Sequence, residues 1–287
     1  MIEILNPGAL ATLQNLGQYQ EAHHAVSAGG AADALSLILG NRLVGNAPDA
    51  VGIEMTMRGA TLRFNVDATF ALTGAPFEAT LDGQPVPHWQ GQAVRAGQQL
   101  RLYASPVGIR CYLTVAGGLR GPVNVPLRAT DRIQIGAVRH EPRALPPAWL
   151  PRFDEQPVLL RITPGAQIDR FWAATRGVLT LSEYEVTADS NRRGIRLEGP
   201  KLRAAESSEL ITEGVPLGAI QVPASGQPII LFVDQQTTGG YAKIANVILR
   251  DVHKLGQLRP RDRVRFEFVT LEEAKRLYRE WHHDLFD

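Results

Sequence analysis

Residues 221–245 read QVPASGQPIILFVDQQTTGGYAKIA, in which the apolar run 229–233 leads into polar, glycine-broken sequence. Short apolar runs bounded by turn residues are typical of buried strands. Paired glycines such as Gly239-Gly240 let a backbone adopt positive φ or approach a ligand closely. The stretch therefore predicts a core strand that opens into a loop able to face a ligand.

Lys243 closes this predicted loop, and the chain has only four lysines against 26 arginines. Lysine is the cation whose pKa burial can tune, so that it serves as an acid, a base or an electrostatic clamp. A solvated lysine on a tight turn explains the same residue type equally well. The sequence leaves both interpretations open.

Composition narrows the class of protein. The chain has 287 residues, 44% hydrophobic and 21% charged, with a formal net charge of +1. These values are typical of a globular protein with a substantial core, and they provide no general attraction for nucleic acid or an anionic membrane. The N-terminal sequence MIEILNPGALATLQ does not resemble a signal peptide, and no apolar stretch reaches 18 residues. We expect a cytoplasmic protein that binds neither nucleic acid nor membrane.

Cysteine and histidine give no sign of a metal site. The single cysteine, Cys111, excludes an internal disulfide and lies in an apolar run, which predicts a buried side chain. The doublets His23-His24 and His282-His283 are sequence neighbours, and neighbouring side chains do not face one ligand from a helix. No metal is expected.

The N-terminal half predicts a mainly β structure with one clear helix. That helix starts after Asp33, whose carboxylate can cap it, and Gly45-Asn46 is a plausible stop. Asp82-Gly83 between two short alternating runs predicts a hairpin, and 109–116 predicts a buried strand. Closely spaced strands with few helices favour an antiparallel barrel or sandwich.

Residues 141–157 contain five prolines among charged residues, which predicts an extended connector. We therefore expect an N-terminal β unit over 1–145, a proline-rich linker over 146–157 and a C-terminal β unit over 158–287.

The C-terminal half predicts further strands, at 158–163, 184–187, 195–197 and 264–268, with a polar turn over 188–194. The chain closes with a predicted helix from Thr270, where Glu273 three residues later forms a capping-box pattern. Trp281 lies on the apolar face of this helix, which favours a packing role.

Common catalytic and nucleotide-binding motifs are absent, including the P-loop, GxGxxG, GxSxG, HExxH and paired CxxC. Three stretches, however, occur in a characteristic order: SNRRGIRLEGP (190–200), EGVPLGAIQVP (213–223), and GQPI (226–229) continuing to QTTGGYAKIA (236–245). Together they resemble the biotin-dependent carboxyltransferase-like family. Its bacterial members include the C subunit of 5-oxoprolinase, and its relatives include the carboxyltransferase region of urea carboxylase and allophanate hydrolase subunit 2-type proteins.

The N-terminal half resembles the same family in GNRLVGN (40–46), IEM (53–55) followed by Gly59, LTGA (72–75) and YLTVAGG (112–118). It departs from the family in QNLGQ (14–18), where the family has Gln-Asp-Leu-Gly-Arg, and in 121–137, which looks shortened. The resemblance implies two linked cyclophilin-like β-barrel units with a few helices.

The resemblance also implies a function within an ATP-dependent 5-oxoprolinase, which opens a small lactam to glutamate. In that assembly the chain would work beside partner proteins that are similar to the A and B subunits of the enzyme. Fixed cations and N–H groups would stabilise the developing negative charge. The candidate catalytic residues are Lys243, Arg192 and Tyr241, with the tyrosine acting as a hydrogen-bond donor or general acid, or serving only as a packing residue. The candidate substrate-binding residues are Asn191, Arg196, Gln221, Gln236, Thr238, Gly239 and Gly240.

Two other functions remain open. One is carboxyl transfer from carboxybiotin to a small amide such as urea, with the biotin carried on another protein because no Met-Lys-Met attachment motif is present. The other is a non-catalytic regulatory role, which the altered N-terminal motifs favour. Under the oxoprolinase interpretation, ATP is bound by the partner proteins or shared with them.

Overall fold

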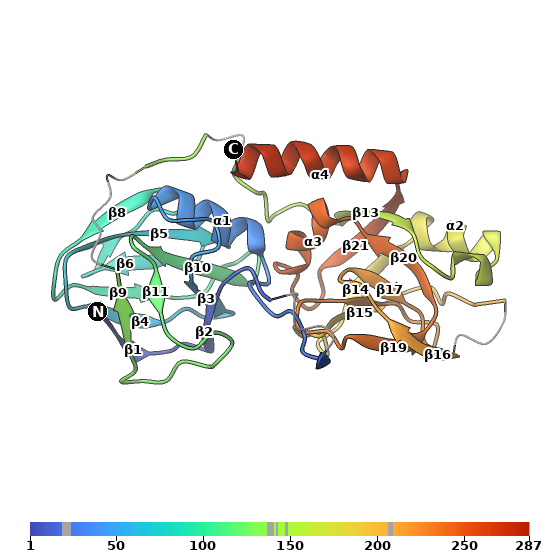
Figure 1. The fold of residues 1–287 in the computed structure, drawn as a ribbon, viewed down its shortest axis with the longest axis horizontal. Coiled ribbons are helices and arrows are strands. Elements are labelled where there is room, and N and C mark those ends of the chain that lie inside the picture. Colours follow the sequence, from blue (N-terminus) through green and yellow to red (C-terminus); the bar gives the residue numbers. More distant parts are fainter. Residues whose placement is uncertain (19–23, 137–140, 142, 147–148, 206–208, 287) are drawn as a thin grey trace. The chain divides into compact units, whose positions relative to one another are not determined.

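The computed structural model describes residues 1–18, 24–136, 141, 143–146, 149–205 and 209–286. These residues are mainly strand, with four α-helices, which confirms the predicted fold class. They form two compact units (Figure 1). The first consists of residues 1–17 and 33–154, and the second of residues 18–32 and 155–287.

The first unit consists of two antiparallel sheets and a helix. Its elements are β1 (Ile2–Asn6), β2 (Leu10–Gln14), α1 (Ala34–Leu43), β3 (Gly52–Thr56), β4 (Thr61–Phe64), β5 (Ala68–Gly74), β6 (Ala79–Leu81), β7 (Gln84–Pro85), β8 (Gly91–Val94), β9 (Gln99–Leu102), β10 (Arg110–Val115), β11 (Leu119–Arg120) and β12 (Arg132–Ile135). One sheet has the order β11-β12-β1-β4-β9-β6-β7 and the other β2-β3-β10-β5-β8. Ile4 and Phe64 of the first sheet share one core with Ile53 and Phe70 of the second.

Helix α1 lies along the five-stranded sheet, beside β5 and β10 (Figure 1). It begins as predicted, because the backbone N–H of Ser36 donates to Asp33 Oδ1 at 3.0 Å and satisfies a free helix-end donor. Close packing requires the glycine at position 40, where a Cβ would lie 2.8 Å from Thr73 Oγ1. Cys111 is fully buried on β10, as predicted.

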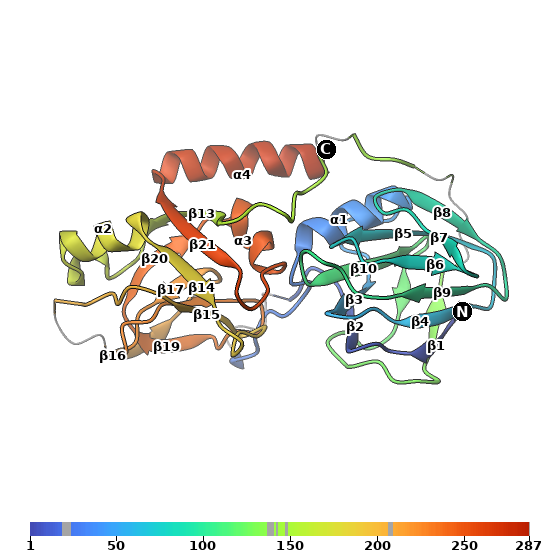
Figure 2. The same cartoon turned by 180° about the vertical axis from the view of Figure 1, so that it is seen from behind.

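The second unit is built around a closed barrel. Its elements are β13 (Val158–Pro164), η3 (Ile168–Arg170), α2 (Ala173–Leu181), β14 (Glu183–Val186), β15 (Gly194–Glu198), β16 (Glu209–Gly214), β17 (Ala219–Gln221), β18 (Ile229–Leu231), β19 (Thr238–Tyr241), β20 (Lys243–Val247), α3 (Leu249–Leu255), β21 (Arg263–Phe268) and α4 (Leu271–Phe286). The barrel order is β13-β20-β17-β18-β15-β14-β21, and β21 closes it by pairing in parallel with β13. Helices α2, α3 and α4 lie outside the barrel (Figure 2).

Alternation along the strands fills the barrel. Val264 and Phe266 of β21 are buried, while Arg263, Arg265 and Glu267 beside them are exposed, which is the predicted period-two pattern. Helix α4 starts where expected, with the backbone N–H of Glu273 donating to Thr270 Oγ1 at 3.1 Å. Trp281 packs, as predicted, with its ring stacked on His253 at a centroid distance of 6.4 Å.

Gln18 and residues 24–32 belong to the second unit, although they were predicted to lie in the first. The backbone N–H of Gly29 donates to the Val233 carbonyl at 3.0 Å, and Ala32 is part of the barrel core. The division after Asp154 lies within the proline-rich segment 146–157. Pro147 and Ala148 of that segment lie outside the described residues.

The predicted loop after β18 is partly a strand. Residues Thr238–Tyr241 form β19, which pairs with β16 in a separate two-stranded sheet. Gly239 and Gly240 are therefore strand residues, and neither has a positive φ. The prediction of a loop was wrong here because its partner strand, β16, lies about 25 residues earlier in the chain.

Candidate functional site

A cleft of about 290 Å³ opens on the second unit beside strands β15, β18 and β19. It is lined by Asn191, Arg193, Gly194, Arg196, Gln221, Ile229, Leu231, Gln236 and Tyr241. Five of the residues proposed from sequence, at positions 191, 196, 221, 236 and 241, are therefore brought together here. Two guanidinium groups, three carboxamides and a phenol surround the cleft, and none of the described lining residues carries a carboxylate.

A tight turn forms one wall. Asn191 and Gly194 exchange two backbone hydrogen bonds, of 3.1 and 3.2 Å. The side-chain Oδ1 of Asn191 accepts a hydrogen bond from the backbone N–H of Arg193 at 2.8 Å. Asparagine is favoured at such a position because its side chain can replace a backbone acceptor. The Asn191 oxygen is thus used by the turn itself.

Ser190 closes the loop that carries this turn. Its Oγ accepts from the backbone N–H of Arg196 at 2.9 Å and lies 3.2 Å from the Arg196 carbonyl oxygen, to which it donates. The turn and the hydroxyl together fix the backbone on both sides of Ile195. Arg193 and Arg196 are consequently presented to the cleft from fixed backbone positions.

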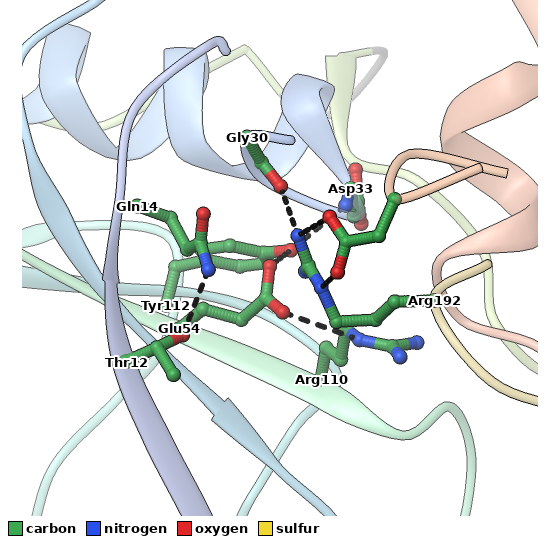
Figure 3. A network of polar contacts seen from close by, with 9 residues as sticks. Thr12, Gln14, Gly30, Asp33, Glu54, Arg110, Tyr112 and Arg192 are labelled. Atoms are coloured by element: carbon green, nitrogen blue, oxygen red, sulfur yellow. Dashed lines mark hydrogen bonds and ion pairs between the residues drawn. The ribbon is translucent and has the colours of Figure 1, made fainter. Parts of the chain in front are cut away.

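Arg192 does not line the cleft, although it lies between two residues that do. Its Nε donates to Asp234 Oδ2 at 2.7 Å and its Nη2 to Asp234 Oδ1 at 3.1 Å. Nη2 also donates to the Gly30 carbonyl at 2.6 Å (Figure 3). This bidentate arrangement, which only arginine can make, ties the backbone at Gly30 to the barrel.

Gln221 lines the cleft and is 2% exposed. A Cβ at position 239 would lie 2.6 Å from Gln221 Nε2 and 3.4 Å from Gln236 Nε2. Gly239 is therefore needed for close approach, but the approaching groups are the protein's own side chains, the two carboxamides and Val215 Cγ1 at 3.2 Å. Within the described residues, Gln221 Nε2 has no hydrogen-bond partner.

Lys243 is buried at 3% exposure, so it is not a solvated surface residue. Its Nζ forms an ion pair with Glu213 Oε1 of β16. Gln167 joins this pair, because its Nε2 donates to Glu213 Oε1 at 2.7 Å and its Oε1 accepts from the Lys243 N–H at 3.2 Å. The hydrogen bond from Lys243 lowers the pKa of Glu213. Lys243 thus secures β16 and does not line the cleft.

Thr238 and Gly240 also lie on β19 without lining the cleft. Thr238 is opposite Gly214, and Gly239 is opposite Glu213, in the β16–β19 register. These residues form the strand that carries Tyr241 to the cleft, where its side chain is 39% exposed.

A family model described as "Carboxyltransferase domain, subdomain A and B" matches residues 24–268. This range contains α1, all strands from β3 to β21 and every residue that lines the cleft. The chain belongs to this family.

Individual relatives support the assignment to the carboxyltransferase-domain family. The C subunit of 5-oxoprolinase from Haemophilus influenzae is 37% identical over 295 residues, covering 97% of this chain and 94% of the relative. The corresponding protein of Escherichia coli is 35% identical, covering 96% and 93%. The crystal structure of Kluyveromyces lactis urea carboxylase superposes with a TM-score of 0.92 at 26% identity, covering 100% of this chain and 29% of that one.

One charged residue of this carboxyltransferase-domain cleft, Arg193, was missed from sequence. Arg192 and Arg193 are identical neighbours, and residue type alone does not say which faces a ligand. The closed turn from Asn191 to Gly194 sends Arg192 to Asp234 and Arg193 to the cleft. In the sequence, Asn191 and Gly194 are three residues apart, as in a tight turn, and such a turn predicts that the two side chains between them point in different directions.

The first unit of the carboxyltransferase domain contains a buried polar row across its five-stranded sheet. Thr12 and Tyr112 lie on either side of Glu54 in register, and the Tyr112 hydroxyl donates to Glu54 Oε2 at 2.7 Å. The same hydroxyl accepts from the Asp33 N–H at 2.8 Å, and Arg110 pairs with Glu54 at 3.4 Å (Figure 3). Burial raises the pKa of Tyr112, which therefore stays protonated as a donor.

The part of the chain that the structure describes holds no group of three or more His, Cys, Asp or Glu side chains placed to bind a metal. His23 lies outside the described residues. Among the described helices none is long and apolar enough to span a membrane.

Proposed function

We propose that this chain is one component of an ATP-dependent 5-oxoprolinase, which opens the lactam ring of 5-oxoproline to glutamate. The observation that carries the proposal is the likeness, over nearly the full length of both chains, to two proteins named as the C subunit of 5-oxoprolinase. The cleft supports it, because carboxamides, guanidinium groups and a phenol surround a volume near the lower end of the range for small-molecule sites.

Recognition of the lactam is assigned to Gln221 and Gln236. The ring holds the amide in the cis form, so its N–H and C=O lie on one edge. A glutamine carboxamide has both a donor and an acceptor, and it can pair with that edge through two hydrogen bonds. Gln221 is preorganised for this role because β17 and the close contact with Gly239 restrict its side chain.

Stabilisation of the developing negative charge is assigned to Tyr241, whose hydroxyl can donate to the lactam oxygen. Lys243 and Arg192 were the first candidates for this role. Since both are engaged by carboxylates outside the cleft, we assign them positioning roles. Lys243, on β20, ties β16 to the barrel, and Arg192 holds the turn that carries Arg193.

ATP and the partner proteins complete the proposal. Opening a lactam to glutamate driven by ATP needs a nucleotide site, and the cleft's volume suits a single five-membered ring better than a nucleoside triphosphate. We therefore assign ATP to the A-like and B-like partner proteins of the complex, or to a site shared with them. This chain would contribute the lactam cleft.

The test is ATP-dependent glutamate release from 5-oxoproline by this chain co-purified with its A-like and B-like partners. We expect release from the three-protein complex and none when this chain is omitted. Lys243→Ala should lower release while the complex still assembles, because β16 and β19 would lose their anchor. Full release without this chain would show a regulatory role and contradict the proposal.

Carboxyl transfer is the second candidate, favoured by the superposition of the whole chain on part of urea carboxylase. Under this function, carboxybiotin carried on another protein would give its carboxyl group to a small amide. Biotin-carboxylated carrier protein should then lose its label when mixed with this chain and urea. No loss with this chain, together with glutamate release in the first assay, would exclude transfer to urea.

A further inference from the structure

Arginines at positions 193 and 196 are the charged groups among the described residues that line the cleft, and none of these residues is a carboxylate that could neutralise them. Other arginines of the same unit are paired: Arg192 with Asp234, Arg161 with Asp251 and Arg263 with Glu183. Within the described residues, neither cleft guanidinium forms an ion pair. The cleft therefore carries two positive charges that lack a counterion from its own walls.

The backbone on both sides of the two arginines is fixed before any ligand arrives. The N–H of Arg193 is bonded to the Asn191 side chain, and that of Arg196 to the Ser190 hydroxyl. Only side-chain rotation remains to be lost when an anion binds. Such preorganisation is characteristic of binding sites, because it lowers the entropy cost of association.

The other residues that line the cleft form an apolar region and an amide region. Ile229 and Leu231 of β18 provide an apolar surface, and the carboxamides of Gln221 and Gln236 provide donor and acceptor groups. A ligand that matches all three regions has an anionic group, an aliphatic body and an amide edge. Guanidinium groups bind carboxylates through parallel hydrogen bonds, which makes a carboxylate the fitting anion.

We propose that Arg193 and Arg196 form a carboxylate subsite that selects anionic lactams over neutral amides. This inference rests on the proposed function and adds a specificity determinant to it. The ring carboxylate of the substrate lies against the two guanidinium groups, while its amide edge lies against the glutamines. Neutral amides of the same size, which lack the carboxylate, bind more weakly.

The test measures KM and kcat of the assembled complex for 5-oxoproline, and inhibition by 2-pyrrolidinone, the same lactam without the carboxylate. We expect Arg193→Gln or Arg196→Gln to raise KM about 10- to 100-fold with kcat largely kept, since uniform binding is lost. The variants should bind 2-pyrrolidinone as the wild type does. Arg279→Gln, an exposed arginine on α4, is the matched control and should change nothing.

Binding to the chain alone separates this inference from the proposed function. Titration with 5-oxoproline, acetate and inorganic phosphate, followed by NMR of arginine side chains, should show that 5-oxoproline displaces both small anions in the wild type and not in R193Q. Preference for phosphate over 5-oxoproline would overturn the carboxylate assignment. Glutamate release with unchanged KM in both variants would overturn the subsite and keep the proposed function. If the complex releases no glutamate but the chain still prefers 5-oxoproline to the small anions, the proposed function is overturned and the carboxylate subsite is kept.

Discussion

Gly239 lies so close to Gln221 that a Cβ at position 239 would be 2.6 Å from the Gln221 amide nitrogen. Gly239→Ala must therefore displace the Gln221 carboxamide and press on Val215 Cγ1, which would lie 3.2 Å from the new Cβ; all of these contacts are with side chains, so the backbone is not forced. We expect the variant to fold, with an unfolding free energy lower by about 1 kcal/mol, and to show roughly tenfold weaker binding of 5-oxoproline. Urea denaturation and KM measure the two effects. Gly214→Ala, where a Cβ meets open space, is the control.

The Arg192–Asp234 pair should contribute to stability more than an exposed pair does. Its side chains are 17% and 33% exposed, and the same guanidinium holds Gly30. Asp234→Asn should lower the unfolding free energy by about 1–3 kcal/mol, between the values typical of surface and buried pairs. Glu183→Gln, which breaks the pair with Arg263 exposed at 58% and 41%, should cost less than about 1 kcal/mol. If urea denaturation shows equal losses of unfolding free energy for the two variants, the stabilising role of the Arg192–Asp234 pair is contradicted.

The Lys243–Glu213 pair predicts acid-sensitive anchoring of β16. The hydrogen bond from Lys243, with that from Gln167, lowers the pKa of Glu213, so the pair is complete above the usual glutamate pKa. Its contribution is lost as the pH falls through the lowered pKa. Hydrogen exchange of β16 and β19 amides should therefore accelerate in acid beyond the general trend. In the Glu213→Gln variant, the β16 and β19 amides should exchange fast already at neutral pH, and their exchange should no longer depend on pH beyond the general trend. If β16 protection is the same in both proteins, the anchoring role is wrong.

His253 makes the fold sensitive to mild acid. Burial first, and then the neighbouring Arg250 and Lys254, lower its pKa to about 3. The unfolded chain takes up a proton near pH 6.5, but the folded chain does not, so stability is lost as the pH falls below about 6.5. The contribution reaches about 1.4 kcal/mol per pH unit between pH 6 and 4. His253→Gln should reduce the slope of unfolding free energy against pH by that amount, and an unchanged slope would contradict the assignment.

Local signals predicted the elements that depend on neighbouring residues. The cap at Asp33, the cap at Thr270 and the Asp82-Gly83 hairpin are all decided within a few residues, and the structure confirms each. Strands β2 and β3 were not foreseen. Each is only five residues long and pairs with segments far away in the sequence, β2 with β3 and β3 also with β10.

The candidate site was partly predictable, because several of its residues lie in local sequence motifs. The motif stretches contain Asn191, Gln221 and Tyr241, and the structure brings these residues to one cleft. The partners that engage Arg192 and Lys243 lie 42 and 30 residues away, so sequence position could not show that both cations were already paired. Arg193 was missed because only the closed turn distinguishes it from its neighbour.

The proposed function depends on binding of the lactam in the cleft around Gln221. Its most direct test is ATP-dependent glutamate release by the assembled complex carrying Gln221→Leu, beside the wild type and Arg279→Gln. Leucine preserves the volume approximately and removes the carboxamide, so we predict that release falls at least about tenfold while the three proteins still co-purify. Release equal to that of the wild type, from a complex of the same composition, would contradict the claim.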